Sequence, residues 1–111
     1  MSLIRTSVAN GVGEVILDRP KALNALDQSM IDDMHAVLTV WADDDSVETV
    51  LVTSASDRAF CAGGDIRAIR DHAVDGDIDA ITHYFHSEYR LDQLVADYPK
   101  AGAMVRKCVA D

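Results

Sequence analysis

The sequence is short of cysteine, of basic residues and of long apolar runs, and each shortage excludes a class of protein. Its 111 residues include only two cysteines, Cys61 and Cys108, which are too few and too far apart for a disulfide framework or a paired zinc knuckle. No apolar run is long enough to cross a bilayer, and the first ten residues lack the apolar centre of a secretory signal. We therefore predict a cytoplasmic protein without a membrane-spanning segment.

Basic side chains are outnumbered by acidic ones, 10 against 19, which gives a formal net charge of -9. Nucleic acids and anionic lipids attract a basic face, so this balance argues against both as partners. With 49% hydrophobic and 26% charged residues, the composition is typical of one small globular domain with a modest core.

Strand patterns come first along the chain and a helix pattern follows. Segments 3–8 and 12–17 are rich in β-branched and aliphatic residues, and Asn10-Gly11 between them is a strong tight-turn signal, so we predict a hairpin. After Asp27, a predicted N-cap, apolar residues recur at spacings of three and four. The residues that carry this helical spacing are Met30, Met34, Val37, Leu38 and Trp41.

The second half of the chain repeats the alternation of strand and helix. Residues 47–53 read as a buried strand, a short segment of helical character follows Asp65, and a long helix is predicted over 77–97. One side of this long helix carries the apolar residues Ile78, Ile81, Phe85, Leu91 and Val95. The resulting ββαβα order predicts an α/β protein.

A glycine-rich loop, FCAGGDI over residues 60–66, leads directly into a helix start. Paired glycines let backbone N–H groups approach a ligand closely, and the positive end of a helix favours negative charge, so such a turn can hold an oxyanion. By spacing alone, Gly-Gly-Asp is more typical of an ordinary turn with an Asp cap. Cys61 is more typical of a small apolar residue entering the turn than of a nucleophile, because nothing supplies it with a base.

The FCAGGDI loop is preceded by LDRPKALNAL, and the two motifs in this order resemble the crotonase (enoyl-CoA hydratase/isomerase) superfamily. The resemblance implies an α/β chain that forms the N-terminal portion of the crotonase-like ββα-superhelix fold. It also implies that the first motif lines a coenzyme A site, whereas the N–H just before the Asp of the second motif donates to the thioester oxygen. These roles assign Gly64 as the catalytic oxyanion-hole donor, Gly63, Asp65 and Ile66 to the substrate, and Lys21, Ala22, Leu23, Asn24 and Ala62 to coenzyme A.

The physics of a thioester agrees with that assignment. Its carbonyl gains negative charge whether it is enolised or attacked, and a preorganised backbone donor stabilises this charge by roughly 3–4 kcal/mol. A net acidic chain also needs local positive charge to bind a polyanion, and Arg19, Lys21, Arg67 and Arg70 flank the two motifs. Each of these four is equally consistent with an exposed solubilising charge, so both interpretations stay open.

A third stretch, FHSEYRL over residues 85–91 followed by DQLVADYPK, resembles the EYxL…K pattern of the 3-hydroxyisobutyryl-CoA hydrolases. This resemblance implies a hydrolase of valine catabolism that cleaves an acyl-CoA thioester to the free acid and coenzyme A. It assigns Glu88 to the hydroxyl end of the substrate, whereas the pattern of the helix alone indicates a solvated residue. The alternative enzyme is an enoyl-CoA hydratase or isomerase.

No metal and no cofactor are expected beyond coenzyme A as part of the substrate. His83 and His86 are three residues apart on a helix, but a third ligand is not evident. Asp75, Asp77 and Asp79 suggest a calcium loop superficially, yet its sixth and twelfth positions are alanine and histidine instead of glycine and glutamate.

The resemblance covers residues 12–100, so we assign 1–100 to the N-terminal part of an enoyl-CoA hydratase/isomerase-like domain and 101–111 to a tail that departs from the pattern. Family members continue with a strand, a second glycine-rich loop that supplies the other oxyanion donor, and acidic residues that act on the thioester. A further hypothesis is therefore a truncated, non-catalytic remnant that binds coenzyme A. An uncovered apolar face predicts aggregation, self-association or association with longer relatives.

Overall fold

The computed structural model describes residues 3–55 and 64–104. The elements run in the order β1 (Ile4–Ala9), β2 (Val12–Leu17), the short 3-10 helix η1 (Pro20–Ala22), α1 (Gln28–Ala42), β3 (Thr49–Ser54), α2 (Ile66–Val74), α3 (Ile78–Ala96) and β4 (Ala101–Met104). The predicted α/β class and the ββαβα order are confirmed, and β4 is a strand that the sequence patterns did not predict.

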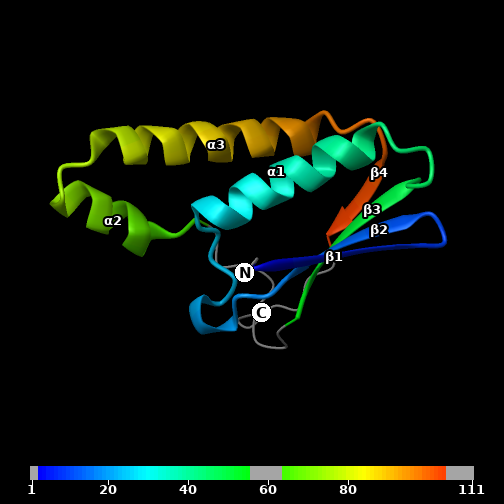
Figure 1. The fold of residues 1–111 in the computed structure, drawn as a ribbon, viewed down its shortest axis with the longest axis horizontal. Coiled ribbons are helices and arrows are strands. Elements are labelled where there is room, and N and C mark those ends of the chain that lie inside the picture. The colour runs from blue at the N-terminus through cyan, green and yellow to red at the C-terminus, as the bar shows by residue number, and fades with distance from the viewer. Residues whose placement is uncertain (1–2, 56–63, 105–111) are drawn as a thin grey trace.

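The four strands form one sheet in the order β1-β2-β3-β4. β1 and β2 are antiparallel and form the predicted hairpin, with Asn10 and Gly11 at φ 53° and 80° in the turn. β3 runs parallel to β2, and β4 runs parallel to β3. Figure 1 shows α1 and α3 side by side over one face of this sheet, with α2 beyond the N-terminal end of α1.

The sheet face under the helices is built by alternation along β2 and β3. Gly13, Val15 and Leu17 are buried on β2, and Val50 and Val52 are buried on β3. The glycine has a packing role, because a Cβ atom added at this position would lie 2.7 Å from the Trp41 ring. The indole of α1 therefore packs directly on the strand backbone.

α1 confirms its predicted N-cap and its predicted apolar face, of which only Val37 is partly rather than fully buried. The Asp27 carboxylate accepts a hydrogen bond from the Met30 N–H at 2.9 Å, which satisfies one of the free donors at the helix start. The helix ends at Ala42, just before the acidic run, and its face toward the sheet is apolar. Its buried residues are Met30, Ile31, Met34, Leu38 and Trp41.

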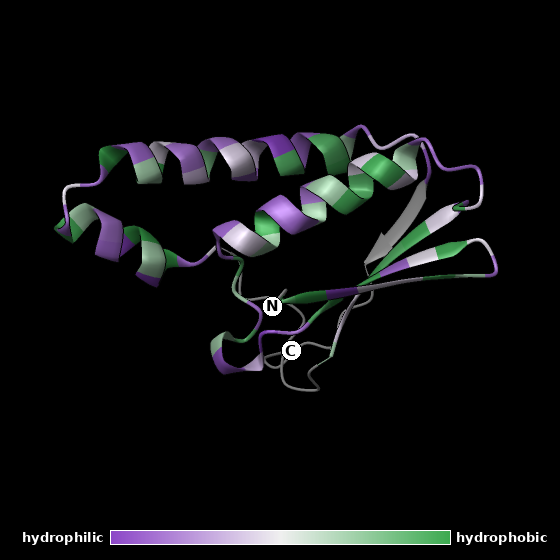
Figure 2. Ribbon diagram, viewed as in Figure 1, coloured by the Kyte–Doolittle hydropathy of each residue, from purple (hydrophilic) through white to green (hydrophobic). Residues whose placement is uncertain are grey.

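α3 has the predicted length, but of its predicted apolar side only Leu91 is fully buried. Tyr84 and Leu91 are its buried residues. Of the predicted apolar side, Ile78 is 66% exposed, Phe85 50% and Val95 48%. The helix packs on α1 along a narrow strip, so most of its circumference faces away from the core. Figure 2 shows hydrophilic and hydrophobic residues alternating along α3. Within the described ranges, no helix combines the length and the apolar character needed to cross a bilayer.

Candidate functional site

The motif residues meet at the carboxyl ends of the parallel strands β2 and β3. The segment after β2 carries Arg19 and Asn24, and the segment after β3 returns at Gly64 and Asp65 to begin α2. The two segments are joined by a parallel bridge between Leu26 and Gly64. In open α/β sheets, ligands bind in the crevice outside the carboxyl ends of the strands. The fold therefore brings both sequence motifs to the edge where a ligand is expected.

Asn24 holds the loop after β2 in shape. Its side chain is fully buried, its Oδ1 accepts from the Arg19 N–H at 2.7 Å, and its Nδ2 donates to the Ser54 hydroxyl at 2.7 Å. Asn24 and its neighbour Leu23 have φ values of 60° and 51° in the left-handed region. Such a conformation is uncommon for a branched residue like leucine, and strained backbone tends to occur at functional sites.

Arg19 connects this loop to the start of α2. Its Nη1 donates to the Ala25 carbonyl at 2.8 Å and to the Asp65 carboxylate at 2.8 Å, and the side chains of this ion pair are only 25% and 11% exposed. Asp65 also caps α2 by accepting from the Ala68 N–H at 3.1 Å. Burial alone would raise the pKa of Asp65, but the hydrogen bond and charge of Arg19 and the capping bond hold that pKa below its usual 3.8.

Tyr84 reaches this edge from α3 and is 4% exposed. Its hydroxyl donates to the Leu26 carbonyl at 2.6 Å and accepts from the Asp65 N–H at 3.0 Å. The Asp65 N–H is shared, because it also lies 3.0 Å from the Leu26 carbonyl oxygen. Burial raises the pKa of Tyr84, and the nearby charges of Glu88 and Asp65 raise it further, against the opposing effect of the Asp65 N–H. The hydroxyl is therefore neutral throughout the physiological range.

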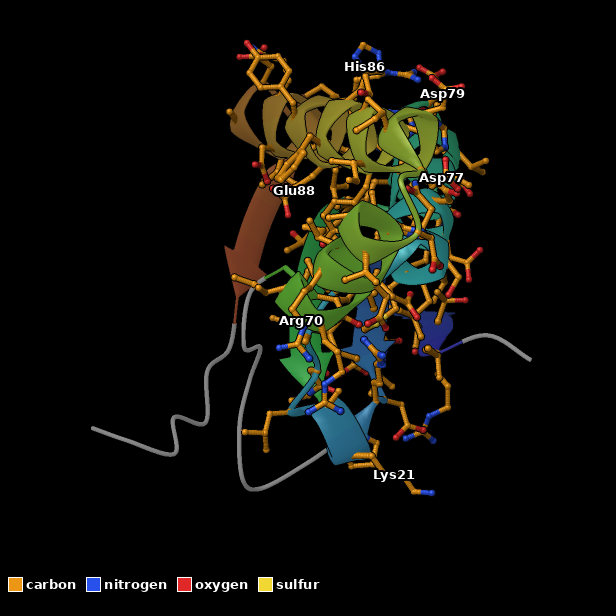
Figure 3. The ribbon with its side chains drawn as sticks, turned by 90° about the vertical axis from the view of Figure 1, so that its left-hand side faces the viewer. Lys21, Arg70, Asp77, Asp79, His86 and Glu88 are labelled. Carbon is orange, nitrogen blue, oxygen red and sulfur yellow. The ribbon has the colours of Figure 1, made fainter. Side chains whose placement is uncertain are left out.

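Glu88 lies one helical turn after Tyr84 and faces the same edge. A Cβ atom added at Gly64 would lie 2.9 Å from the Glu88 Oε2 and 2.9 Å from the Tyr84 hydroxyl oxygen. Position 64 thus has no room for a side chain unless these groups move. In Figure 3, Glu88 lies on the side of α3 toward the sheet, whereas His86 and Asp79 lie on its outer side.

The four cations near the motifs separate into two kinds. Arg19 is committed to the Asp65 carboxylate, so it is not available as an exposed charge for a ligand. Lys21 on η1 and Arg67 and Arg70 on α2 are exposed. Figure 3 shows Arg70 projecting from α2 and Lys21 on η1, at the edge of the molecule opposite α3. These three charges remain able to meet an anion in solution.

The remaining predicted site residues differ in exposure. Ala22 and Leu23 are half-buried, and Ile66 is 77% exposed at the start of α2. Gly63 and Ala62 lie outside the described residues, as does Cys61. Among the described residues, none accepts a hydrogen bond from the Gly64 N–H, the predicted oxyanion donor. The ligand roles of these residues stay predictions.

Features that resemble other kinds of site lie apart from this edge. In the described part of the chain, no three His, Cys, Asp or Glu side chains gather to hold a metal ion. A hollow of about 130 Å³ between α1 and α3 involves none of the predicted site residues. Its lining is formed by Ile31, Asp32, His35, Ala36, Ser87 and Arg90.

One residue and one ion pair of the site were missed by the sequence analysis. Tyr84 belongs to neither motif, although its position four residues before Glu88 puts it on the same helix face and was an available signal. The pairing of Arg19 with Asp65 spans 46 residues and had no local signal.

Comparison with known proteins agrees with the motif assignment. A family model described as enoyl-CoA hydratase/isomerase matches residues 12–105. The chain is 39% identical over 90 residues to the mitochondrial 3-hydroxyisobutyryl-CoA hydrolase of Gallus gallus, a match that covers 81% of this chain and 23% of that protein. It is 36% identical over 91 residues to the small ribosomal subunit protein mS47 of Schizosaccharomyces pombe, covering 82% of this chain and 21% of that protein.

A solved structure matches the fold closely. An enoyl-CoA hydratase from Rhodobacter sphaeroides superposes with a TM-score of 0.91 and 34% identity, over 96% of this chain and 32% of that one. The superposition confirms that the chain has the fold of the N-terminal part of crotonase-type structures. The chain spans less than a quarter of the length of the curated relatives described above.

Proposed function

The chain belongs to the enoyl-CoA hydratase/isomerase family, and from that premise we propose that it contributes the thioester and acyl contacts of a 3-hydroxyisobutyryl-CoA hydrolase. In this proposal Gly64 donates its N–H to the thioester oxygen, and Glu88 accepts a hydrogen bond from the substrate's hydroxyl group. Lys21, with Arg67 and Arg70, meets the phosphates of coenzyme A. The water attack itself needs the second oxyanion donor and the acidic residues that the resemblance assigns to later segments of family members.

The observation that carries the proposal is the closeness of the Glu88 carboxylate to Gly64. The hydroxyl of a 3-hydroxyacyl group is only a few bonds from its thioester carbonyl. The protein groups that bind the hydroxyl and the carbonyl must therefore be neighbours. The Glu88 Oε2 lies 2.9 Å from the point that a Cβ of Gly64 would occupy, although the residues are 24 positions apart. This proximity supports a substrate with a hydroxyl close to the thioester.

The loop after β2 supports the cofactor part of the proposal. Asn24 and Arg19 are occupied by internal hydrogen bonds, so we assign them to holding the loop. Lys21, Ala22 and Leu23 form the outer surface of this loop and remain the coenzyme A contacts that we propose. An ordered loop reduces the conformational entropy lost when the ligand binds.

Thiol release from 3-hydroxyisobutyryl-CoA by the folded 111-residue chain tests the reaction. Free thiol, with circular dichroism showing native helix and strand, supports a hydrolase and would show that carboxylates within this chain carry out the attack that we place in later segments. Hydration of an enoyl-CoA without thiol release supports a hydratase instead, the activity named for the Rhodobacter sphaeroides structure at 34% identity. Binding of 3-hydroxyisobutyryl-CoA without turnover is the result expected if the water attack needs the later segments. Binding of coenzyme A with no preference for the acyl group supports a non-catalytic role instead, in line with the likeness to a ribosomal protein.

Substitution of Glu88 by glutamine tests the acyl contact separately from turnover. We expect E88Q to weaken binding of 3-hydroxyisobutyryl-CoA about tenfold or more, because a hydrogen bond to a charged group contributes about 1.5–3 kcal/mol. Binding of isobutyryl-CoA, which lacks the hydroxyl, should change little. The measurement is isothermal titration calorimetry with both thioesters.

The matched control is Asp92→Asn, which removes an exposed carboxylate one turn further along α3. It should leave both affinities unchanged. Equal losses of affinity for the two thioesters in E88Q would show that Glu88 does not bind the hydroxyl. The assignment of this substrate would then fail.

The name of a relative and the features of this sequence indicate different cellular locations. The Gallus gallus relative is named as a mitochondrial protein, whereas the features of this sequence predict a cytoplasmic one. We keep the cytoplasmic location as a proposal that fractionation of cells expressing the protein would test.

A further inference from the structure

We propose that Tyr84 is a positioning residue of this site, whose hydroxyl holds the Gly64–Asp65 segment against Leu26 and thereby aims the Gly64 N–H. The role toward a thioester rests on the proposed function. The ordering of the segment is a property of the chain alone and is tested without a ligand.

The need for such a residue follows from the glycine loop. An oxyanion donor stabilises the developing charge only if it is already oriented before the reaction. Gly63-Gly64 has wide backbone freedom by its chemistry, so the sequence of the loop does not orient the donor by itself. The restraint must come from neighbouring elements, and Tyr84 belongs to a helix that packs on α1.

The contacts of Tyr84 match this task. Its hydroxyl gives its one proton to the Leu26 carbonyl at 2.6 Å and accepts from the Asp65 N–H at 3.0 Å, so it ties together both sides of the Leu26–Gly64 bridge. The hydroxyl oxygen also lies 2.9 Å from the point that a Cβ of Gly64 would occupy. Tyr84 therefore restrains Gly64 in two ways. Its hydroxyl oxygen occupies the space beside the Gly64 Cα, and its hydrogen bond holds the peptide group that joins Gly64 to Asp65.

Protonation of Tyr84 is required for both bonds at once. A phenolate could accept from Asp65 but would have no proton for the Leu26 carbonyl. Burial, followed by the charges of Glu88 and Asp65, raises the pKa of Tyr84 above its usual 10.0. The bridge consequently persists at every pH at which the proposed reaction would run.

Tyr98 offers a matched control within the same chain. Its hydroxyl donates to the Leu38 carbonyl at 2.6 Å, the same kind of bond at the same length, and Leu38 belongs to the interior of α1 away from Gly64. Removing either hydroxyl deletes one hydrogen bond to a partly buried backbone carbonyl, and removing the Tyr84 hydroxyl also deletes an acceptor of the Asp65 N–H. Only Tyr84→Phe changes the surroundings of Gly64.

The experiment compares Y84F and Y98F in the 111-residue chain by amide hydrogen exchange and by ligand spectroscopy. We expect the Asp65 amide to exchange about fivefold to tenfold faster in Y84F, relative to the change in global stability, and to be unaffected in Y98F. For bound isobutyryl-CoA labelled with carbon-13 at the thioester, we expect the carbonyl stretch to rise in frequency in Y84F alone, because a weaker hydrogen bond polarises the carbonyl less.

Equal behaviour of the two variants in the exchange experiment would overturn the positioning role. If the wild-type chain binds no thioester, the proposed function fails, while the exchange rates still decide the role of Tyr84. Should Y84F not fold, the wild-type chain supplies a second measurement. A slowly exchanging Tyr84 hydroxyl proton close to the Asp65 amide supports the proposal, and a rapidly exchanging hydroxyl without that contact refutes it.

Discussion

Asp65 shows how one residue combines a local and a distant task. As the N-cap of α2 it uses one carboxylate oxygen for the Ala68 N–H, and as a partner of Arg19 it uses the other. The capping role can be predicted from a Gly-Gly-Asp sequence before a helix. The distant task depends on the approach of two segments that are far apart along the chain.

Replacing Asp65 by asparagine separates these tasks, because an amide oxygen still caps a helix but carries no charge. We expect D65N to lower the free energy of unfolding by about 1.5–3 kcal/mol at pH 7 through loss of the charged bond to Arg19. The folded pKa of Asp65 lies below 3.8, so its contribution is present above that pH and is lost as the pH falls through the folded pKa. Urea denaturation at pH 7 and in the acid range measures both effects.

The control for D65N is Asp18→Asn. Its ion pair with Arg5 is 3.3 Å long, with side chains 61% and 40% exposed, so its removal should change stability by no more than about 0.5 kcal/mol. A loss in D65N as small as this, or one that stays constant into the acid range, would contradict the assignment of the charge pair.

Helices and hairpin were predicted well because their signals are local. The Asn10-Gly11 turn, the Asp27 cap and the spacing of apolar residues on α1 all lie within a few residues of the structure that they specify. The buried face of α3 was predicted less well, since Leu91 is buried as predicted but Tyr84, which was not predicted, is buried as well. Amphipathic spacing indicates that a helix exists, but the neighbours decide which side is covered.

The C-terminal end of α1 is stabilised by residues that follow α3. Lys100 donates through Nζ to the carbonyls of Trp41 and Asp44, and Tyr98 binds the Leu38 carbonyl. Carbonyls at a helix end lack partners within the helix and carry partial negative charge, so a cation there is favourable. The segment that enters β4 is thereby held on α1.

Lys100→Met tests this cap while keeping a side chain of similar length. We expect K100M to lower the free energy of unfolding by about 1–2 kcal/mol, because two carbonyl acceptors lose a charged donor. Chemical denaturation followed by circular dichroism measures the loss. Lys21→Met removes the same charge from an exposed position and should change stability by about 0.5 kcal/mol or less. Equal values for the two variants would show that the cap contributes nothing.

At the scale of the whole molecule, the surface combines strong negative charge with exposed apolar residues. The net charge of -9 keeps molecules apart by repulsion. Exposed apolar side chains oppose this repulsion. Along α3, Ile78, Phe85 and Tyr89 are spaced seven and four residues apart and are 50–66% exposed. Such an apolar stripe favours association once the repulsion is screened.

We therefore expect the 111-residue chain to self-associate with rising protein concentration, and more strongly in high salt. The double variant Phe85→Gln, Tyr89→Gln should shift the population towards monomer, because it removes apolar area without changing the charge. Sedimentation equilibrium measures the shift. Val40→Gln, at a 65% exposed position on α1, is the control. A wild-type chain that stays monomeric at all salt concentrations would contradict the expectation.

What the sequence determined by itself were the features encoded within short windows. These are the hairpin, the capped helix α1, the α/β class and, through two ordered motifs, the family. The tertiary structure decided the rest: the pairing of Arg19 with Asp65, the placing of Tyr84 and Glu88 beside Gly64, and the parallel addition of β4 to β3. The physical reason is that periodicity and capping depend on residues a few positions apart, whereas these contacts form only when packing brings distant segments to one edge of the sheet.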